Sequence, residues 1–190
     1  MKTAPNGFAA DNFSLSLDPS VSQNLTTADR MDGKVIDLYN AATGIGFANF
    51  FPDNDGVIRK LPLFLNFADR QYMGLSFSMV TGILNATDDN ISVEPRKEIR
   101  IQPPGGDASS VFRIPIDEKG QALISYQGTF QTFRYISYYD VLMQRIPAET
   151  FEGRIVLVGT SAAGLSDIRP VPFQDAFPGV EIHANVIYNI

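Results

Sequence analysis

The chain has 190 residues, is 44% hydrophobic and 19% charged, and carries a formal net charge of −6. This length and composition predict one globular domain of ordinary size and exclude a disordered protein. The acidic balance, without a run of Lys or Arg, argues against a nucleic-acid-binding surface. The sequence has no cysteine, which excludes disulfides, thiolate nucleophiles and cysteine-ligated metals.

The ends of the sequence carry no targeting signal. No segment reaches the roughly 18 consecutive apolar residues of a membrane span, and the first residues lack the apolar core of a signal peptide. The sequence ends at Ile190, inside a helical pattern. We therefore expect it to be one part of a longer protein.

Residues 1–35 begin without a clear period and then enter a helical pattern, so we assign them to an irregular N-terminal segment that precedes the main domain at 36–190. The helical spacing predicts a helix over 28–42. Gly33 weakens its first half by about 1 kcal/mol relative to Ala, and Gly44 provides a stop.

Two aromatic-rich apolar runs follow, at 45–51 and 57–65. The sequence Pro-Asp-Asn-Asp-Gly between them is a dense turn signal, and together they predict an antiparallel hairpin. Apolar residues at helical spacing then predict a helix over 73–84.

The next part of the chain contains shorter elements. We expect a strand over 98–101, and a hairpin made of 111–115 and 121–126 around the Asp-Glu-Lys-Gly turn. A capping-box-like sequence at 137–140 predicts a helix start, and Pro147 stops that helix.

The last forty residues organise the predicted fold. The apolar run 154–158, ended by glycine, is typical of a strand buried on both faces. A loop of small residues, 159–167, follows, and Pro178 suits the start of a final helix. The residues of this helix that recur at helical spacing are Val180, His183, Ala184, Ile187 and Ile190.

These elements predict a single α/β domain, in which helices pack on a mixed β-sheet that also contains hairpins. In an open α/β sheet, ligands usually bind in loops beyond the carboxyl ends of strands. The loop 159–167 is therefore the first candidate for a binding site.

The candidate ligand-binding residues are Thr160, Ser161, Asp167, Arg169 and His183. The loop offers backbone amides and two hydroxyls, the arginine offers a bidentate donor for a carboxylate or phosphate, and the histidine titrates near neutral pH. The alternative stays open that the loop is a tight connection, that Asp167 and Arg169 form a local clasp, and that His183 is packed in the core.

The sequence Asp53-Asn54-Asp55-Gly56 begins like a calcium loop, but the fifth and twelfth positions of that loop are Val and Phe, which are not ligands. We therefore interpret Asp53, Asp55, Gly56 and Arg59 as a structural turn with the glycine at positive φ. No catalytic residue, metal site or cofactor is predicted.

Three stretches of the chain resemble the signatures of one family. The first runs from Gly46 through Pro52-Asp53-Asn54-Asp55-Gly56 to Leu63, and the second is Ser137-Tyr138-Tyr139-Asp140-Val141-Leu142. The third combines residues 151–162, Asp167 and residues 178–185. In this order the motifs resemble the second class of the CHASE-type extracellular sensor domains (cyclase- and histidine-kinase-associated sensory domains), whereas residues 1–35 do not match the family pattern.

The resemblance implies an extracytoplasmic sensor, in the periplasm or at the cell surface, that belongs to a bacterial transmembrane receptor. In that family the module is flanked by membrane helices and is joined to intracellular outputs such as nucleotide cyclases and kinases. It further implies an unknown small-molecule ligand, a homodimer and no nucleic acid. Two other functions stay open, namely a hydrolase or transferase that uses the loop 159–169 and a ligand-free dimerisation scaffold.

Overall fold

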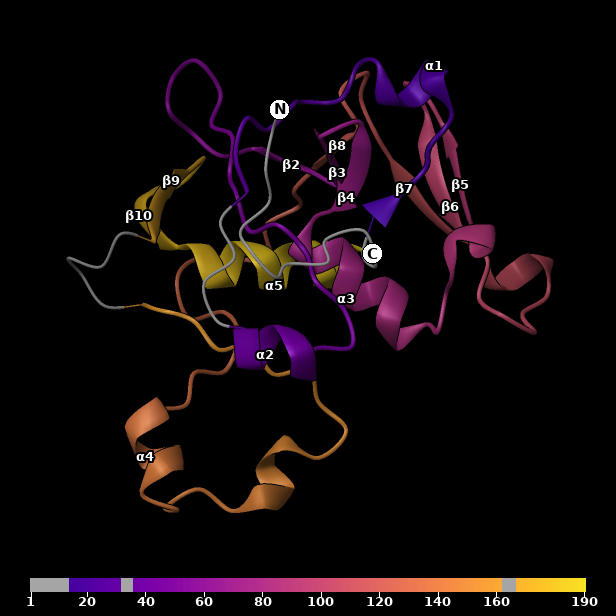
Figure 1. Cartoon of the computed structure of the whole chain (residues 1–190). Coiled ribbons are helices and arrows are strands. Elements are labelled where there is room, and N and C mark those ends of the chain that lie inside the picture. Colours follow the sequence, from indigo (N-terminus) through magenta and orange to yellow (C-terminus); the bar gives the residue numbers. More distant parts are fainter. Residues whose placement is uncertain (1–13, 32–35, 162–166) are drawn as a thin grey trace.

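The computed structural model describes residues 14–31, 36–161 and 167–190. Helices and small sheets share one hydrophobic core, which confirms the predicted α/β class (Figure 1). In chain order the helices are α1 (Pro19–Ser22), α2 (Ile36–Ala41), α3 (Leu75–Ile83), α4 (Tyr138–Leu142) and α5 (Gly179–Asn189). The strands are β1 (Ser14–Leu15), β2 (Lys60–Pro62), β3 (Phe64–Phe67), β4 (Arg70–Met73), β5 (Ile91–Glu94), β6 (Glu98–Ile101), β7 (Phe112–Pro115), β8 (Gln121–Leu123), β9 (Ile168–Val171) and β10 (Gln174–Pro178).

The named strands pair antiparallel, in the orders β1-β4-β3, β5-β6-β7, β2-β8 and β10-β9. Ala68 and Asp69 connect β3 to β4 with φ of 48° and 65°. Positive φ at both central residues is the geometry of the tight hairpin turn that matches the twist of two strands.

The pairing of β2 with β8 lies at the centre of the connections between the sheets. Hydrogen bonds from Leu63 N to Gly120 O (3.0 Å) and from Ile124 N to Arg59 O (2.9 Å) extend it beyond both strands. Ile58 N then donates to Pro170 O (2.9 Å), which joins the segment just before β2 to β9. The chain around β8 is therefore held against the turn before β2 and connected to the C-terminal hairpin.

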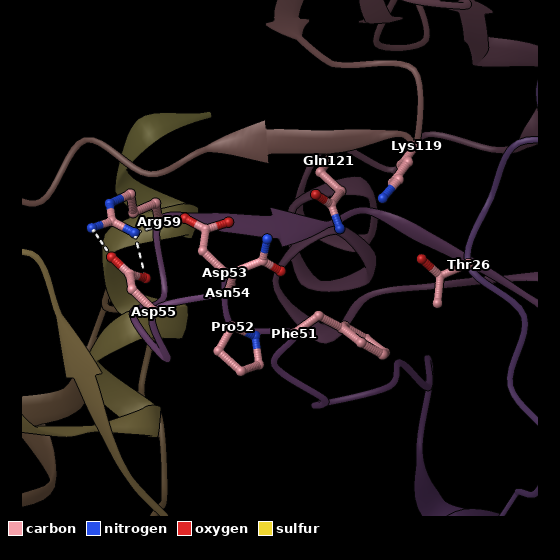
Figure 2. A pocket seen from close by; sticks show the side chains of 9 residues that line it. All are labelled: Thr26, Phe51, Pro52, Asp53, Asn54, Asp55, Arg59, Lys119 and Gln121. Atoms are coloured by element: carbon pink, nitrogen blue, oxygen red, sulfur yellow. Dashed lines mark hydrogen bonds and ion pairs between the residues drawn. The ribbon is translucent and has the colours of Figure 1, made fainter.

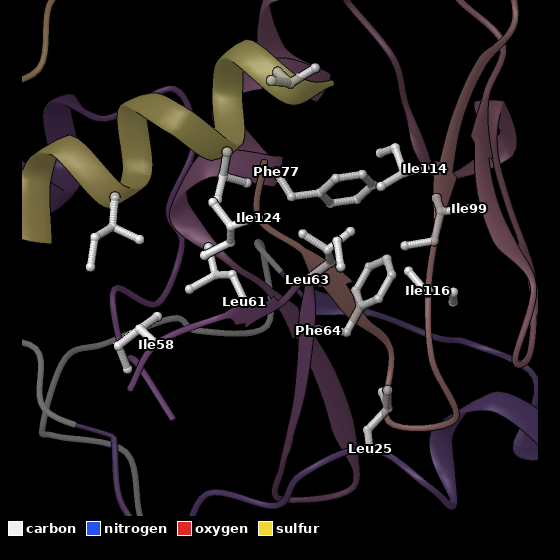
Figure 3. Packing of buried hydrophobic residues seen from close by; sticks show 14 of the residues in the cluster. Leu25, Ile58, Leu61, Leu63, Phe64, Phe77, Ile99, Ile114, Ile116 and Ile124 are labelled. Carbon is white, nitrogen blue, oxygen red and sulfur yellow. The ribbon is translucent and has the colours of Figure 1, made fainter. Parts of the chain in front are cut away.

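The hydrophobic core lies where these sheets meet α3 and α5 (Figure 3). The rings of Phe64 and Phe77 meet edge to face with centroids 5.2 Å apart, and both side chains are fully buried. Ile182 and Val186 of α5 join them from the C-terminal helix. Each such side chain stabilises the fold by about 1.5–3 kcal/mol through removal of apolar surface from water.

The helices α3 and α5 and the strands β6 and β7 match the sequence-based predictions closely, but α5 buries a different face. Of the stripe predicted from spacing, only His183 is buried, and the other buried positions include Glu181, Ile182, Asn185 and Val186. The reason is that α5 packs against α3 and also binds the main chain of residues 125–132 through its polar side chains.

The predicted strand 154–158 is wrong. This segment has no regular structure, and Ile155, Val156 and Val158 are 51%, 48% and 78% exposed. An apolar β-prone run forms a strand only where a neighbouring strand offers its backbone groups, and none in the described chain pairs with it.

The two predicted hairpins are wrong in their pairing. Residues 45–51 do not pair with β2 but lie along the start of α3, where Phe47 N donates to Met73 O (3.0 Å) and Leu75 N to Phe47 O (2.8 Å). In the second case the turn at 117–120 is present, but β7 pairs with β6 and β8 pairs with β2. In both cases a partner distant in sequence displaced the adjacent one.

The N-terminal part contains more structure than the sequence indicated. Of the helix predicted at 28–42, residues 28–31 are not helical, residues 32–35 lie outside the described residues, and α2 covers 36–41. The strand β1 and the helix α1 lie within the segment taken as irregular. Leu15 and Val21 of that segment are buried. The strand β5 and the β9–β10 hairpin were not predicted from the sequence. At 137–140 the helix α4 is present, but Ser137 makes no side-chain capping bond.

Candidate functional site

The Asp53–Gly56 turn is clamped by one arginine. Gly56 has φ +83°, and its N–H donates to Asp53 O (2.8 Å). Arg59 donates to Asp55 through Nη1 (2.9 Å) and Nη2 (2.7 Å) and to Asp53 through Nη1 (2.9 Å). These bonds from Arg59, with that of the Val57 amide, lower the pKa of Asp55 to about 2, so its charge persists through the physiological range.

An open pocket of about 670 Å³ lies beside this turn (Figure 2). The residues that line it come from chain segments far apart in sequence. They are Thr26, Phe51, Pro52, Asp53, Asn54, Asp55, Arg59, Lys119 and Gln121. Concave sites where polar groups converge are the usual places for small ligands, so this pocket is a candidate functional site.

Asp117 anchors the far wall of the pocket. Its Oδ1 accepts hydrogen bonds from the backbone N–H groups of Lys119 (2.9 Å) and Gln121 (3.0 Å), and its Oδ2 accepts one from Lys60 Nζ (2.9 Å). Partial burial alone would raise the pKa of this carboxyl, but the bonds from Lys60 and the two amides outweigh it and lower the pKa. These bonds fix the turn at 117–120, and the side chains of Lys119 and Gln121 line the pocket.

The loop site predicted from the sequence is only partly assembled. Thr160 and Ser161 are exposed, and the middle of the loop, 162–166, lies outside the described residues. Arg169 lies in β9 opposite Phe177. Within the described parts of the chain, no ion pair joins it to Asp167, so the predicted clasp is not formed there.

Asp167 and His183 do lie near each other at the start of α5. The Asp167 carbonyl accepts a hydrogen bond from Gly179 N (2.8 Å), and its carboxylate lies so close to Gly179 that a Cβ there would be 2.3 Å from Oδ1. This close approach explains why glycine occupies the first position of the helix.

His183 is a buried residue, 5% exposed, with its ring 4.9 Å from that of Phe50. Its Nδ1 lies 2.8 Å from Ser76 Oγ, whereas Nε2 has no hydrogen-bond partner in the described structure. Burial lowers the pKa of His183, against the opposing effects of the nearby Ala48 carbonyl and the Asp167 carboxylate. The ring is therefore neutral at pH 7 and connects α5 to α3.

Three polar side chains one helical turn apart on α5 bind the chain that follows β8. Glu181 accepts hydrogen bonds from the N–H groups of Gln131 and Thr132 (both 3.1 Å) and from the Tyr135 hydroxyl (2.8 Å). Asn185 Oδ1 accepts one from Gln127 N (2.8 Å).

The third member, Asn189, accepts a hydrogen bond from Ser125 N and donates one to Ser125 O, both at 2.9 Å. We call Glu181, Asn185 and Asn189 the polar stripe of α5. Because Glu181 and Asn185 are only 2% and 1% exposed, water cannot easily replace the hydrogen bonds with which they hold residues 127–132 to the helix.

The described residues contain no cluster of His, Cys, Asp and Glu side chains that could hold a metal ion. No helix among them has the length and apolar character needed to span a bilayer.

Comparison with known proteins gives one family. The model of the CHASE2 domain matches residues 5–190, nearly the whole chain, so the expectation that residues 1–35 do not match the family pattern is wrong from residue 5 onward. The chain belongs to the CHASE2 family. CHASE2 domains are extracellular sensory domains of signalling receptors and are not a catalytic family. Neither the curated proteins nor the solved structures contain a significant match to it.

The CHASE2 signatures occupy different parts of the structure. The first supplies the Asp53–Gly56 turn, Arg59 and β2, the second is α4, and the third includes the polar stripe residues Glu181 and Asn185. The first signature contains the pocket-lining residues from Pro52 to Arg59. The lining residues Thr26, Lys119 and Gln121 lie outside the signatures and were not predicted from the sequence. No local pattern marks these three residues. The pairing of β2 with β8 brings Lys119 and Gln121 to the turn, and Thr26 is held through the bonds of its segment with Asn66.

Proposed function

We propose that this CHASE2 domain is the extracytoplasmic signal-input module of a bacterial transmembrane receptor, and that it controls an intracellular cyclase or kinase. The match over residues 5–190 carries this proposal, because the family is sensory and extracellular. Flanking membrane helices and an output domain would lie in other parts of the receptor.

The arrangement of α5 supports a role in passing on a signal. The polar stripe ties this helix to residues 125–132, and Ser76 ties it to α3 through His183. A conformational change near β8 would therefore be transmitted to α5 through hydrogen bonds rather than through loose packing. A ligand shifts such an equilibrium only if it binds the two arrangements unequally.

We propose further that the domain itself has no catalytic activity and needs no cofactor. The hydrolase alternative requires Ser161, His183 and Asp167 to act as a triad. Nδ1 of the histidine is instead engaged with Ser76 in the protein interior, and Ser161 is exposed and makes no hydrogen bond with it in the described structure. A triad needs the nucleophile within hydrogen-bond reach of its base.

The experiment is to place the domain in its receptor and to measure topology and output together. A reporter enzyme that is active only outside the cytoplasm, fused directly after the domain, should be active. Asn185→Ala should change output activity in membranes while surface abundance stays constant, and Asn24→Ala, at an exposed residue outside both α5 and the pocket lining, is the matched control. A cytoplasmic location, or an output that does not respond to loss of the stripe, would refute the proposal.

Self-association is a second role that a specific observation favours. Within residues 136–161 the exposed apolar side chains are Tyr138, Tyr139, Val141, Leu142, Met143, Ile155, Val156 and Val158. Exposed apolar patches of this kind commonly mark interaction sites. We propose a weak homodimer that membrane anchoring strengthens. Leu142→Asp should lower self-association in sedimentation, whereas Leu123→Asp, at an equally exposed leucine elsewhere, should not.

A further inference from the structure

The pocket beside the Asp53–Gly56 turn contains polar groups that the protein leaves without bonds. The Lys119 ammonium, the Gln121 amide and the Thr26 hydroxyl make no side-chain hydrogen bond or ion pair with any described residue. Figure 2 shows Arg59 and Asp55 held together at one side of the pocket, with Asn54 beside Asp53, while Lys119, Gln121 and Thr26 lie on the other side.

The charges that line the pocket are separated. At the turn, two carboxylates share one guanidinium, since Arg59 binds both Asp53 and Asp55, which leaves a net charge of about −1 there. The opposite wall carries the unpaired Lys119 ammonium, a charge of +1. A molecule that contains both an ammonium and a carboxylate complements both walls, whereas a simple anion or cation complements only one.

We propose that this pocket binds a small zwitterion of the amino-acid class, with its carboxylate at Lys119 and its ammonium at Asp53. Gln121, Asn54 and Thr26 supply further neutral hydrogen-bonding groups around the ligand. The Phe51 ring supplies the apolar wall against which a side chain of the ligand packs. Only one oxygen of Asp53 is engaged by Arg59, so the other is available as an acceptor.

The pocket is connected to α5 by one continuous segment. Lys119 and Gln121 belong to the turn that Asp117 anchors, and β8 follows directly. Beyond β8 the same segment is held by the polar stripe at Ser125, Gln127, Gln131 and Thr132. A ligand that pulls Lys119 toward the turn therefore acts on the chain whose other end is bonded to the C-terminal helix.

The binding test uses the 190-residue chain and the twenty common L-amino acids as probes, in thermal-shift assays followed by calorimetry. At least one amino acid should bind, and its N-acetyl derivative and its amide, which each lack one charge, should bind at least tenfold more weakly. Lys119→Met should weaken binding at least tenfold. Lys97→Met removes an ammonium that pairs with Glu94 outside the pocket, and should leave binding unchanged.

The proposal is overturned if none of the twenty binds, or if Lys119→Met binds as tightly as the parent chain. Circular dichroism of each variant establishes that it is folded, and Asp53→Asn gives an independent second variant with the same expected loss. A bound probe should also slow amide hydrogen exchange at residues 125–132.

This inference names the ligand class for the sensory role proposed above, and the two fail separately. Binding that depends on Lys119 but leaves receptor output unchanged supports the pocket and counts against the sensory role. Output that responds to loss of the polar stripe, with no amino acid bound, overturns the pocket and leaves the sensory role standing.

Discussion

The outer segment, residues 136–161, and the rest of the described chain use apolar side chains in opposite ways. No residue of the outer segment is buried, although it contains α4 and the run Ile155-Val156-Leu157-Val158. In the inner body, which comprises the other described residues, a continuous cluster of buried residues connects every sheet to α3 and α5. Figure 1 shows the outer segment below α2, set apart from the sheets.

This difference indicates that the inner body determines the stability of the fold, whereas the outer segment is suited to contact with another molecule. The inner body supplies its own partners, so its apolar residues hold the fold together. The outer segment exposes residues that can gain stabilisation only from contact with something else. We therefore expect mutations in the two regions to affect different measurements, namely unfolding for the inner body and association for the outer segment.

The largest contrast is expected from two truncations to alanine. Phe77→Ala should lower the free energy of unfolding by about 3–5 kcal/mol, because it leaves a cavity beside Phe64 in a fully buried position. Leu142→Ala, at a 62% exposed side chain of α4, should change it by less than about 0.5 kcal/mol. Urea denaturation of both variants measures this, and comparable losses would show that the outer segment is part of the folded core.

A second contrast uses the same change of residue at two glutamates. Glu181→Gln should cost about 1–3 kcal/mol, because a buried carboxylate that accepts three hydrogen bonds is replaced by a group with one acceptor. Glu149→Gln, exposed in the outer segment, should cost less than about 0.5 kcal/mol. If both variants unfold at the parent's urea midpoint, the polar stripe contributes nothing to stability.

Sequence reasoning succeeded where the signal is local. The helix α3 and the strand β6 follow from periodicity, and Gly56 has the positive φ expected of its turn. It failed for the partners of strands, because adjacent runs were paired by proximity in sequence whereas β2 pairs with β8. Propensity specifies which residues favour an extended chain and does not specify which backbone they will meet.

The candidate site shows the same limit. Asp53, Asp55 and Arg59 could be assigned to the turn from their spacing alone. Thr26 and Lys119 could not be associated with that turn, since they are distant from it in sequence and only the tertiary fold brings them close to it. The buried Glu181 was missed for a related reason, because a charged residue looks like a solvent-facing position until the main-chain donors that satisfy it are known.

A third prediction concerns pH, to which only the inner body should respond near neutrality. His183 is the only histidine of the chain, and its pKa is lowered in the folded state. The unfolded state therefore binds the proton more tightly, so stability is complete above the unfolded pKa of about 6.5 and falls as the pH drops from there toward the folded pKa. Asp167, the nearby acidic group, opposes this loss only in part.

The measurement is the free energy of unfolding at intervals between pH 8 and 5. The parent chain should lose stability through this range, and His183→Asn should show a smaller dependence, although it is less stable throughout because the contact with Ser76 is altered. An equal slope in both proteins would assign the pH response to other groups.

The smallest difference in stability between the two regions is expected when one glycine in each is replaced by alanine. Gly120 and Gly153 have similar φ, +69° and +64°, so alanine introduces comparable backbone strain at both. At Gly120 a Cβ would also lie 2.7 Å from Leu25 Cδ2, against the buried core, and we expect a loss of about 1–3 kcal/mol. At Gly153 nothing lies within 4 Å, and the unburied outer segment can relax, so we expect a loss below about 1 kcal/mol. Thermal unfolding of both variants tests this difference. A loss for Gly153→Ala as large as that for Gly120→Ala would mean that the outer segment is held as rigidly as the core, and that its exposed apolar residues are fixed in place before any partner binds.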